Sequence, residues 1–364
     1  MVQICFDQQI FRLLGRGGIS RCFADLIRGL PAPGLAVRLP FRCHGNIHLQ
    51  GPGLIRVPIQ LYQLRRRLGW ADGSEIDTRI PAQVAAAGLL HATYYLGAPP
   101  RALSCPLVST LHDMTPELWP QLAPLGRGGR WLRKREWLEA SDAIVSVSAS
   151  SAADLTGLVP HLAGRIRVIH HGSGFQQLPP RPCRRPPRRP FHLYVGRRGG
   201  YKNTAALFEL LGRLPGQLVL AGGGPLRGDE RRQLRRCGLA GRVQLVDPTD
   251  AELAWLYRHC RAVLVPSLAE GFSLPLIEAL ACDAPVIASD LPVHREIGGD
   301  YATLLAPSDG EAWHQVLADP APPPRPSQLL GTAAAAELRH HFSLERMLAD
   351  YRRFYRDLLG AVRS

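Results

Sequence analysis

Residues 261–289, RAVLVPSLAEGFSLPLIEALACDAPVIAS, contain two short apolar runs on either side of a stretch with helical character. RAVLVPS and APVIAS are short apolar segments of the length expected for buried strands. Between them, Pro275 suits the first turn of a helix, because its missing N–H is not needed there. A strand, a helix and a second strand in this order predict parallel strands that are covered by helices.

The same alternation continues on both sides of this stretch. In the second half FHLYVG, QLVLAGG and RVQLV are predicted strands, and in the first half VQICF, PLVSTLHD, AIVSVS and RIRVIHH are. ISRCFADLIRGL has apolar residues at helical spacing and is stopped by Pro31. With 364 residues, enough for two ordinary domains, the sequence predicts an α/β protein with two Rossmann-like domains that face each other across a cleft.

The domain boundaries follow from a proline-rich break and from the end of the chain. LPPRPCRRPPRRP, residues 178–190, cannot sustain a helix or a sheet and is predicted to be an extended linker. It separates an amino-terminal domain, 1–177, from a carboxyl-terminal domain, 191–343. Residues 344–364 form a long amphipathic helix that is expected to pack back across both lobes.

The net charge of +14 comes almost entirely from arginine and indicates a polyanionic partner. Nucleic acid, an anionic membrane and a phosphorylated substrate all fit, but no helix-turn-helix signal, zinc spacing or RNP aromatics favour nucleic acid. The eight cysteines are scattered without a CxxC pair, which indicates reduced thiols rather than a zinc site or disulfides. No membrane-spanning run or signal peptide is apparent, so a cytoplasmic location is expected.

AEGFSLPLIE predicts an anion site, because ligands of open α/β sheets bind beyond the carboxyl ends of strands. The N–H groups of Ser273 and Leu274 lie at the positive end of a helix, and Glu270 lies beside them. The alternative is simple helix capping. Carboxylates accept hydrogen bonds from hydroxyls in pairs, so acids beside a phosphate site favour a nucleotide sugar. Glu278 would then bind the ribose and Glu270 the sugar.

Two further loops follow predicted strands. YVGRRGGYKN, residues 194–203, carries Arg197, Arg198 and Lys202 on a loop that contains glycine, and such cations suit a diphosphate. The alternative is a solvated basic loop. Gly222 and Gly223 begin a GGG turn that lets backbone approach a ligand, or is only a tight turn, and it lacks GxGxxG spacing.

These motifs together resemble the retaining glycosyltransferases of family 4, which have the GT-B fold. Glu270 and Glu278 match the family's pattern of two glutamates separated by seven residues. VGRRGGYKN is similar to its diphosphate loop and singles out Arg198 over Arg197. IASDLPVHREIGGDYATLLAP, GRGGISR (15–21), HATYY (91–95) and TLHDMTPELWP (110–120) are similar to other landmarks of the family and its subgroup.

The resemblance implies an acceptor-binding first domain, a donor-binding second domain, and sugar transfer with retention and without a metal or other cofactor. Arg198 and Lys202 would offset the charge of the leaving diphosphate, His112 would face the donor sugar, and the leaving phosphate would take the acceptor's proton. Glu270 as a covalent nucleophile is disfavoured. The implied catalytic residues are Glu270, His112, Arg198 and Lys202. The implied donor-binding residues are Gly17, Gly18, Arg198, Lys202, Gly222, Gly223, Glu270, Gly271, Phe272, Ser273, Leu274 and Glu278, and the acceptor residues are Asp113 and Arg21.

The subgroup resemblance favours mannose transfer from GDP-mannose to a lipid-linked acceptor in O-antigen or exopolysaccharide assembly. Two basic segments with aromatic residues, 55–70 and 127–140, suit an anionic membrane surface, so a peripheral position at the inner face of the cytoplasmic membrane is expected. Two solvated helices are the alternative. Other functions remain open: transfer from a UDP-sugar donor, an epimerase, a phosphorylase, or a non-catalytic subunit that binds the sugar nucleotide or docks on the membrane as part of an assembly.

Overall fold

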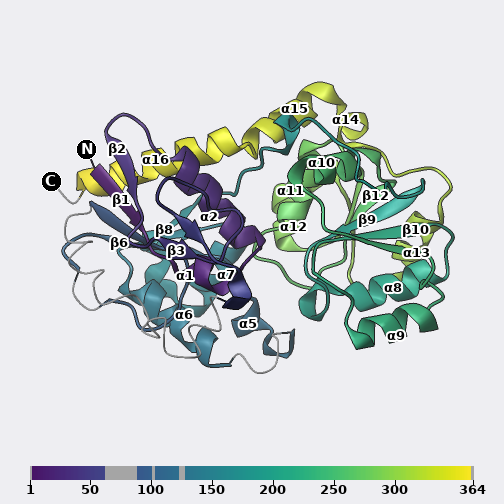
Figure 1. Cartoon of the computed structure of the whole chain (residues 1–364), viewed down its shortest axis with the longest axis horizontal. Coiled ribbons are helices and arrows are strands. Elements are labelled where there is room, and N and C mark those ends of the chain that lie inside the picture. The colour runs from purple at the N-terminus through teal and green to yellow at the C-terminus, as the bar shows by residue number, and fades with distance from the viewer. Residues whose placement is uncertain (1, 62–87, 101–102, 123–127, 362–364) are drawn as a thin grey trace. The chain divides into compact units, whose positions relative to one another are not determined.

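The computed structural model describes residues 2–61, 88–100, 103–122 and 128–361, which form two compact units (Figure 1). Unit 1 takes in Met1–Met114, Pro124–His171 and Leu344–Ser364. Unit 2 takes in Thr115–Ala123 and Gly172–Ser343. Each unit is built around one six-stranded sheet whose strand pairs are all parallel.

The sheet of unit 1 has the order β2-β1-β5-β6-β7-β8. Its strands are β1 (Val2–Phe6), β2 (Leu35–Arg38), β5 (Leu89–Ala92), β6 (Leu107–Leu111), β7 (Ala143–Ser146) and β8 (Ile166–Val168), and β3 (Cys43–His44) pairs separately with β4 (Ile55–Arg56). The four strands predicted in this half are present. The sequence did not predict β2 (LAVR) or β5 (LLHA).

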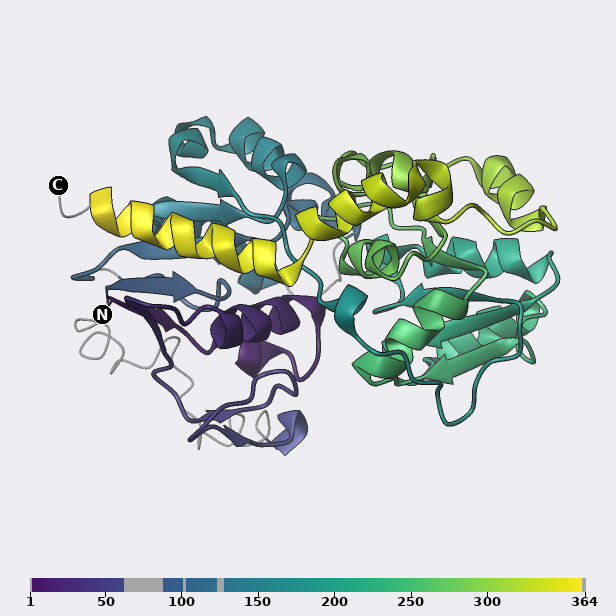
Figure 2. The ribbon, with the colours of Figure 1, turned by 90° about the horizontal axis from the view of Figure 1, so that it is seen from above.

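The helices of unit 1 are α1 (Gln9–Leu13), α2 (Gly18–Gly29), α6 (Gly128–Ala140), α7 (Ala149–Leu158) and α16 (Leu344–Ala361). As predicted, α2 buries one apolar face, which includes Phe23, Leu26 and Ile27. Tyr351 and Tyr355 of α16 join the same core. Figures 1 and 2 show α16 running beside α2, and the Arg352 guanidinium donates a hydrogen bond to the Leu30 carbonyl (3.2 Å).

The sheet of unit 2 has the order β11-β10-β9-β12-β13-β14. Its strands are β9 (Phe191–Val195), β10 (Gln217–Ala221), β11 (Val243–Val246), β12 (Ala262–Val265), β13 (Val286–Ser289) and β14 (Thr303–Leu305). The chain adds strands outward from β9 in one direction and then, from β12, in the other. The switch point therefore lies between β9 and β12, where open α/β sheets bind ligands.

Eight α-helices are described in unit 2 besides α5 (Thr115–Leu118). They are α8 (Thr204–Gly212), α9 (Gly228–Arg236), α10 (Asp250–His259), α11 (Leu274–Ala281), α12 (Pro292–Ile297), α13 (Gly310–Ala318), α14 (Pro326–Leu329) and α15 (Gly331–His341). The short 3₁₀ helices of the chain are η1 (Pro120–Leu122), η2 (Pro160–Arg165), η3 (Phe175–Gln177), η4 (Gly200–Lys202) and η5 (Gly299–Tyr301). Within the described ranges no helix is long and apolar enough to cross a membrane.

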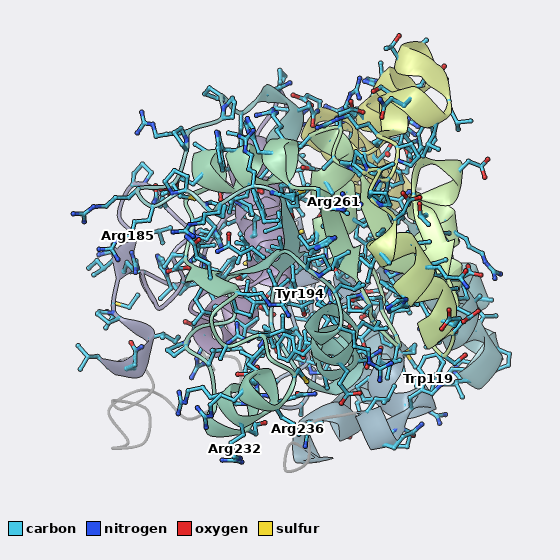
Figure 3. All side chains as sticks on the ribbon, turned by 90° about the vertical axis from the view of Figure 1, so that its right-hand side faces the viewer. Trp119, Arg185, Tyr194, Arg232, Arg236 and Arg261 are labelled. Atoms are coloured by element: carbon cyan, nitrogen blue, oxygen red, sulfur yellow. The ribbon has the colours of Figure 1, made fainter. Side chains whose placement is uncertain are left out.

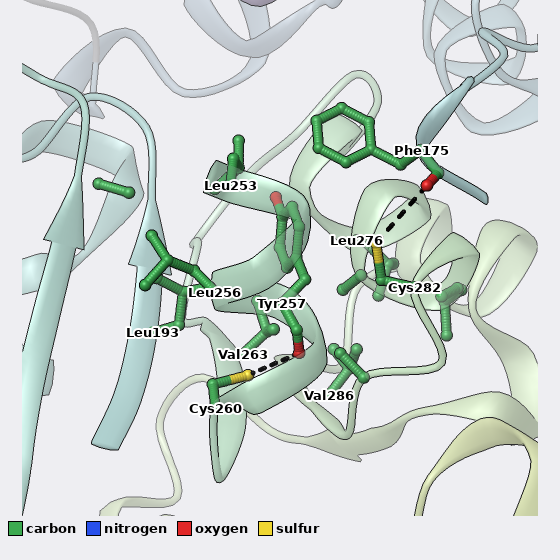
Figure 4. Packing of buried hydrophobic residues seen from close by; sticks show 14 of the residues in the cluster. Phe175, Leu193, Leu253, Leu256, Tyr257, Cys260, Val263, Leu276, Cys282 and Val286 are labelled. Atoms are coloured by element: carbon green, nitrogen blue, oxygen red, sulfur yellow. Dashed lines mark hydrogen bonds between the residues drawn. The ribbon is translucent and has the colours of Figure 1, made fainter. Parts of the chain in front are cut away.

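Buried cysteines belong to the core of unit 2 (Figure 4). The Cys260 thiol donates a hydrogen bond to the Tyr257 carbonyl (3.2 Å), and burial raises its pKa to about 12. All eight cysteines of the chain are free, and five of them are buried. The buried thiols therefore act as small apolar groups, as the scattered spacing predicted.

Candidate functional site

Lys202 and Glu270 form an ion pair at the switch point of the unit 2 sheet. Lys202 ends the short helix after β9, and Glu270 lies in the loop after β12. Lys202 Nζ is 2.5 Å from Glu270 Oε1, and the Ser267 hydroxyl donates to the same oxygen (2.8 Å). The backbone N–H of Leu268 donates to the Tyr201 carbonyl (2.7 Å), so the two loops are also joined through their backbones.

The environment of this pair keeps the lysine charged. Burial lowers the pKa of Lys202, but the Glu270 carboxylate, the neighbouring tyrosines and the hydrogen bond to Glu270 outweigh burial, so the pKa is raised overall. The Glu270 side chain is only 5% exposed and that of Lys202 is 21% exposed. The loops thus hold a permanent cation and an acceptor group at the edge where a ligand would bind.

The second glutamate, Glu278, lies on α11 and is held by α10. The Tyr257 hydroxyl donates to Glu278 Oε2 (2.8 Å), and both side chains are buried. At the start of the same helix, the Ser273 hydroxyl oxygen is buried without a hydrogen-bond partner among the described residues. The remaining predicted residues of this loop, Gly271, Phe272 and Leu274, lie between Glu270 and Glu278, so the predicted motif is one loop and the helix that follows it.

Replacing Tyr257 with phenylalanine tests whether this hydrogen bond orients Glu278 for a ligand. The substitution keeps the ring in the core and removes only the donor, so we expect stability to fall by about 1 kcal/mol. If Glu278 binds the ribose, nucleotide affinity should fall severalfold. Calorimetric titration and thermal unfolding measure the two effects, with Tyr301→Phe, whose hydroxyl bonds the Ala334 carbonyl instead, as the control. Equal nucleotide affinity in both variants would show that the hydrogen bond from Tyr257 to Glu278 is not needed for nucleotide binding.

The structure gives Arg198 internal partners. Its side chain is 1% exposed and its Nε donates to Glu230 Oε1 (3.0 Å). The other nitrogens donate to the carbonyls of Gly222, Gly223, Gly224 and Pro225, at 2.9, 3.3, 2.9 and 3.0 Å. Arg198 therefore clamps the glycine loop to α9. On the same loop Arg197 is exposed, so Arg197 is the arginine that faces solvent.

The three glycines after β10 are required by this clamp. Gly222, Gly223 and Gly224 have φ values of +76°, +73° and +73°, a region that other residues rarely adopt. A Cβ atom on Gly223 would lie 2.6 Å from an Arg198 nitrogen and 2.7 Å from the Gly196 carbonyl oxygen. The GGG turn thus permits close packing on Arg198, which is a structural reason for the glycines.

His294 on α12 is a site residue that the sequence reasoning missed. Its Nδ1 lies 2.7 Å from the Ser289 carbonyl oxygen and must therefore carry the proton, which leaves Nε2 as an acceptor. Nε2 is buried without a partner in the described part of the chain. Burial lowers the pKa of His294, while the charge of Glu270 opposes that effect. The only sequence signal was a histidine in the helix after β13.

In unit 1, His112 follows β6 and is held as a neutral imidazole. Its Nε2 is 3.4 Å from the Thr93 carbonyl oxygen, and its Nδ1 is buried without a partner within the described ranges. Burial lowers its pKa to about 3, with a contribution from the charge of Lys134. The Lys134 ammonium donates to the carbonyl of Asp113 (2.7 Å), so a buried lysine supports the loop that follows His112.

The other predicted residues of unit 1 lie around the start of α2. Gly17 precedes the helix with extended backbone (φ 175°), Gly18 is its first residue, and the Arg21 N–H donates to the Gly17 carbonyl (3.0 Å). A Cβ atom on Gly17 would lie 2.9 Å from Leu14 Cδ1. Close packing against Leu14 is therefore a structural reason for a glycine at position 17.

The expectation that segment 127–140 faces a membrane is wrong for its inner residues. Trp137 is fully buried and its indole N–H donates to the Gly97 carbonyl (3.0 Å), and Lys134 is 2% exposed. These two side chains belong to the core because α6 covers the sheet with that face. Of the segment 55–70, only residues 55–61 lie in the described part of the chain, and there Ile55 and Leu61 are exposed.

Two models of known protein families match different parts of the chain. The family model described as glycosyl transferases group 1 matches residues 180–319, and the model described as Glycosyltransferase Family 4 matches residues 16–173. The two parts of the chain are therefore similar to two families of glycosyltransferases.

Similar proteins have several stated activities. The O-antigen chain mannosyltransferase B of Escherichia coli is 28% identical over 56% of this chain and 58% of its own length. A D-inositol 3-phosphate glycosyltransferase of Xylanimonas cellulosilytica is 31% identical over 63% of this chain and 62% of its own length. The chain thus spans about three-fifths of the length of these two relatives.

Solved structures confirm the fold. The sucrose-phosphate synthase of Thermosynechococcus elongatus matches with a TM-score of 0.74 at 23% identity, covering 99% of this chain and 100% of that one. Anabaena HepE in complex with UDP-glucose matches with a TM-score of 0.69 at 17% identity, over 99% and 100% of the two chains. Two Rossmann-like α/β domains of the GT-B type are therefore present, as predicted.

Proposed function

We propose that this protein is a retaining glycosyltransferase that moves a sugar from a nucleotide-sugar donor to a hydroxyl group of an acceptor glycan. The observation that carries the proposal is the Lys202–Glu270 pair at the switch point of the unit 2 sheet. Glu278 lies on α11, the helix that starts beside this pair, and its carboxylate accepts a hydrogen bond from Tyr257 on α10. Lys202 and the start of α11 supply partners for a diphosphate, Glu270 supplies a partner for the sugar, and Glu278 supplies one for the ribose.

In the proposed reaction, the bond between the anomeric carbon and the diphosphate oxygen breaks while the acceptor oxygen attacks the same face. The leaving diphosphate gains negative charge, and Lys202 and the positive end of α11 stabilise that charge. Glu270 binds hydroxyls of the sugar and Glu278 the ribose. The leaving phosphate oxygen accepts the acceptor's proton, so no separate base is needed and Lys202 supplies charge without a metal.

Neutral His112 fits a role as a hydrogen-bonding group that faces the sugar. With its pKa lowered to about 3, the ring carries no charge at neutral pH, and its unpartnered Nδ1 remains available to a ligand hydroxyl. Asp113 and Arg21 are proposed acceptor contacts, and Gly17 and Gly18 backbone contacts to the donor. Arg198 supports this site through the glycine loop rather than by direct contact with the diphosphate.

For the donor we propose GDP-mannose, and for the acceptor a lipid-linked polysaccharide at the inner face of the cytoplasmic membrane. The E. coli relative is named an O-antigen chain mannosyltransferase, and a relative of Rhizobium leguminosarum, 33% identical over 35% of this chain and 36% of its own length, is named a lipopolysaccharide core biosynthesis mannosyltransferase. The UDP-glucose complex of HepE favours a UDP donor as the second candidate.

Calorimetric titration with GDP, UDP and ADP in EDTA tests the class and the donor together. We expect GDP to bind most tightly, to need no metal, and to bind weakly to Lys202→Ala. A preference for UDP would still support a glycosyltransferase but would make a UDP-sugar the donor in place of GDP-mannose. Binding that requires magnesium would contradict charge stabilisation by Lys202 alone. Absence of binding by all three would contradict the proposed function and support a membrane-docked assembly subunit instead.

A further inference from the structure

Residues 181–189, RPCRRPPRR, were predicted to be a linker but lie along unit 2 as a fixed strip. The arginines of this strip, which we call the arginine ridge, are Arg181, Arg184, Arg185, Arg188 and Arg189, and all five are exposed. Neither the fold nor the proposed chemistry at Lys202 and Glu270 uses them. The ridge therefore needs an explanation of its own.

The ridge is held by its backbone and by the residues between its arginines. Cys183 and Pro187 are buried in unit 2. The Arg181 N–H donates to the Ala251 carbonyl (3.0 Å), and the Gln244 side-chain amide donates to the Arg185 carbonyl (2.8 Å). Proline restricts the backbone further. Because these contacts use the backbone and the intervening side chains, the arginine side chains are left pointing to solvent.

Most of the arginines of the ridge are not neutralised by an acidic neighbour within the described part of the chain. Glu252 on α10 lies near Arg181 and the Arg184 backbone, which contribute to lowering its pKa after its own hydrogen bonds with Thr249. Arg189 lies over the ring of Trp255, 5.1 Å from its centroid. Arg184, Arg185 and Arg188 form no ion pair with any residue that the structure describes. Three exposed guanidinium groups within five residues thus face water.

We propose that the arginine ridge docks unit 2 on an anionic lipid surface by binding headgroup phosphates. Guanidinium groups suit phosphate because several N–H donors can bind at once. A ridge fixed in advance loses less conformational entropy on docking than a flexible linker would. Apolar insertion is not part of the contact, because Cys183 and Pro187 are buried and the exposed members between the arginines are prolines without a long apolar side chain.

Single-stranded nucleic acid is the competing anionic partner, and the ridge lacks what such a partner uses. Binding of single strands combines phosphate contacts with aromatic rings on which bases stack. The ring beside the ridge, Trp255, already stacks with His259, with centroids 4.2 Å apart, and also carries Arg189. The ridge therefore offers charge without a free aromatic face, which favours a lipid surface.

The test is flotation of the full chain with phosphatidylcholine vesicles that do or do not contain phosphatidylglycerol. Each arginine near an anionic surface contributes roughly a fivefold factor in partitioning, so Arg184→Gln, Arg185→Gln and Arg188→Gln together should weaken binding by roughly a hundredfold. The matched control carries Arg232→Gln, Arg235→Gln and Arg236→Gln on α9, where the side chains are also exposed. Figure 3 shows Arg185 of the ridge together with Arg232 and Arg236 of α9. The control changes the net charge by the same amount.

The outcomes separate the ridge from overall charge and from the catalytic proposal. Loss of binding in the ridge variant alone, with nucleotide titration unchanged in both variants, supports the proposal. Equal loss in both variants would assign binding to net charge. Equal binding of the wild-type chain to pure phosphatidylcholine vesicles would overturn docking on an anionic surface. An oligonucleotide that binds the ridge more tightly than phosphatidylglycerol vesicles would make nucleic acid the partner. If the wild-type chain binds anionic vesicles but no nucleotide, the proposed function is contradicted while the docking surface is still supported.

Discussion

Lys202→Ala is expected to lower kcat by about a hundredfold to a thousandfold, with a smaller effect on the binding of the intact donor. Removing one preorganised group that stabilises developing charge costs about 2.7–4 kcal/mol in other enzymes. Lys202 is placed for this role by its 2.5 Å contact with Glu270 and by a raised pKa that keeps it charged. The effect should fall mainly on kcat, because negative charge grows on the diphosphate only as the sugar leaves.

Single-turnover transfer from GDP-mannose, or from UDP-glucose if the titration selects UDP, measures this loss. Arg213→Ala is the matched control, because it removes one positive charge from an exposed position at the end of α8. Lys202→Arg should recover part of the rate, because a guanidinium restores the positive charge but differs from an ammonium in size and geometry. Wild-type turnover in Lys202→Ala would remove this residue from the transition state and with it the central argument for the reaction.

Arg198→Met is expected to destabilise unit 2 by about 3 kcal/mol, because the substitution removes the nearest cation of the buried Glu230 and leaves it only Arg227, whose side chain is half exposed. The side chains of Arg198 and Glu230 are 1% and 5% exposed, so solvent does little to screen the remaining charge. Four carbonyl groups of the glycine loop would lose their donor at the same time. Methionine has a similar length, so the result would report the lost charge and hydrogen bonds more than a cavity.

Scanning calorimetry with Arg197→Met as the control distinguishes the two arginines of this loop. Arg197 is exposed, so its substitution should change stability by less than about 0.5 kcal/mol. If Arg198→Met keeps the wild-type melting transition but loses nucleotide binding, the diphosphate role expected from the sequence is right. A lowered transition with nucleotide binding retained at low temperature would assign Arg198 to the loop alone.

The sequence was sufficient where local patterns determine the structure. Short apolar runs with turn residues after them predicted nine of the strands. The positions after β9 and β12 put Lys202 and Glu270 in one predicted donor site, and in the structure the two side chains meet. Parallel strands put their carboxyl ends on one edge, so this meeting follows from topology. The spacing between Glu270 and Glu278 placed Glu278 on the helix that follows, and the structure has it on α11.

Partners that lie far apart in the sequence could not be predicted in this way. Arg198 is paired with Glu230 on α9, and a helical pattern does not show which acid turns inward. The same holds for Tyr257 beneath Glu278. The strip 181–189 looks like a free linker because its attachment uses backbone groups and two small side chains, which leave no pattern.

The contact between Lys202 and Glu270 also bears on how the enzyme would complete each cycle. In the structure each of these charges already satisfies the other, so a donor bound as proposed competes with an internal partner. An intact donor can engage both residues at once, with diphosphate for the lysine and sugar hydroxyls for the carboxylate. After transfer the spent nucleotide holds only the lysine, and the freed carboxylate competes for it. We therefore expect product release to be favoured by re-formation of the resting pair.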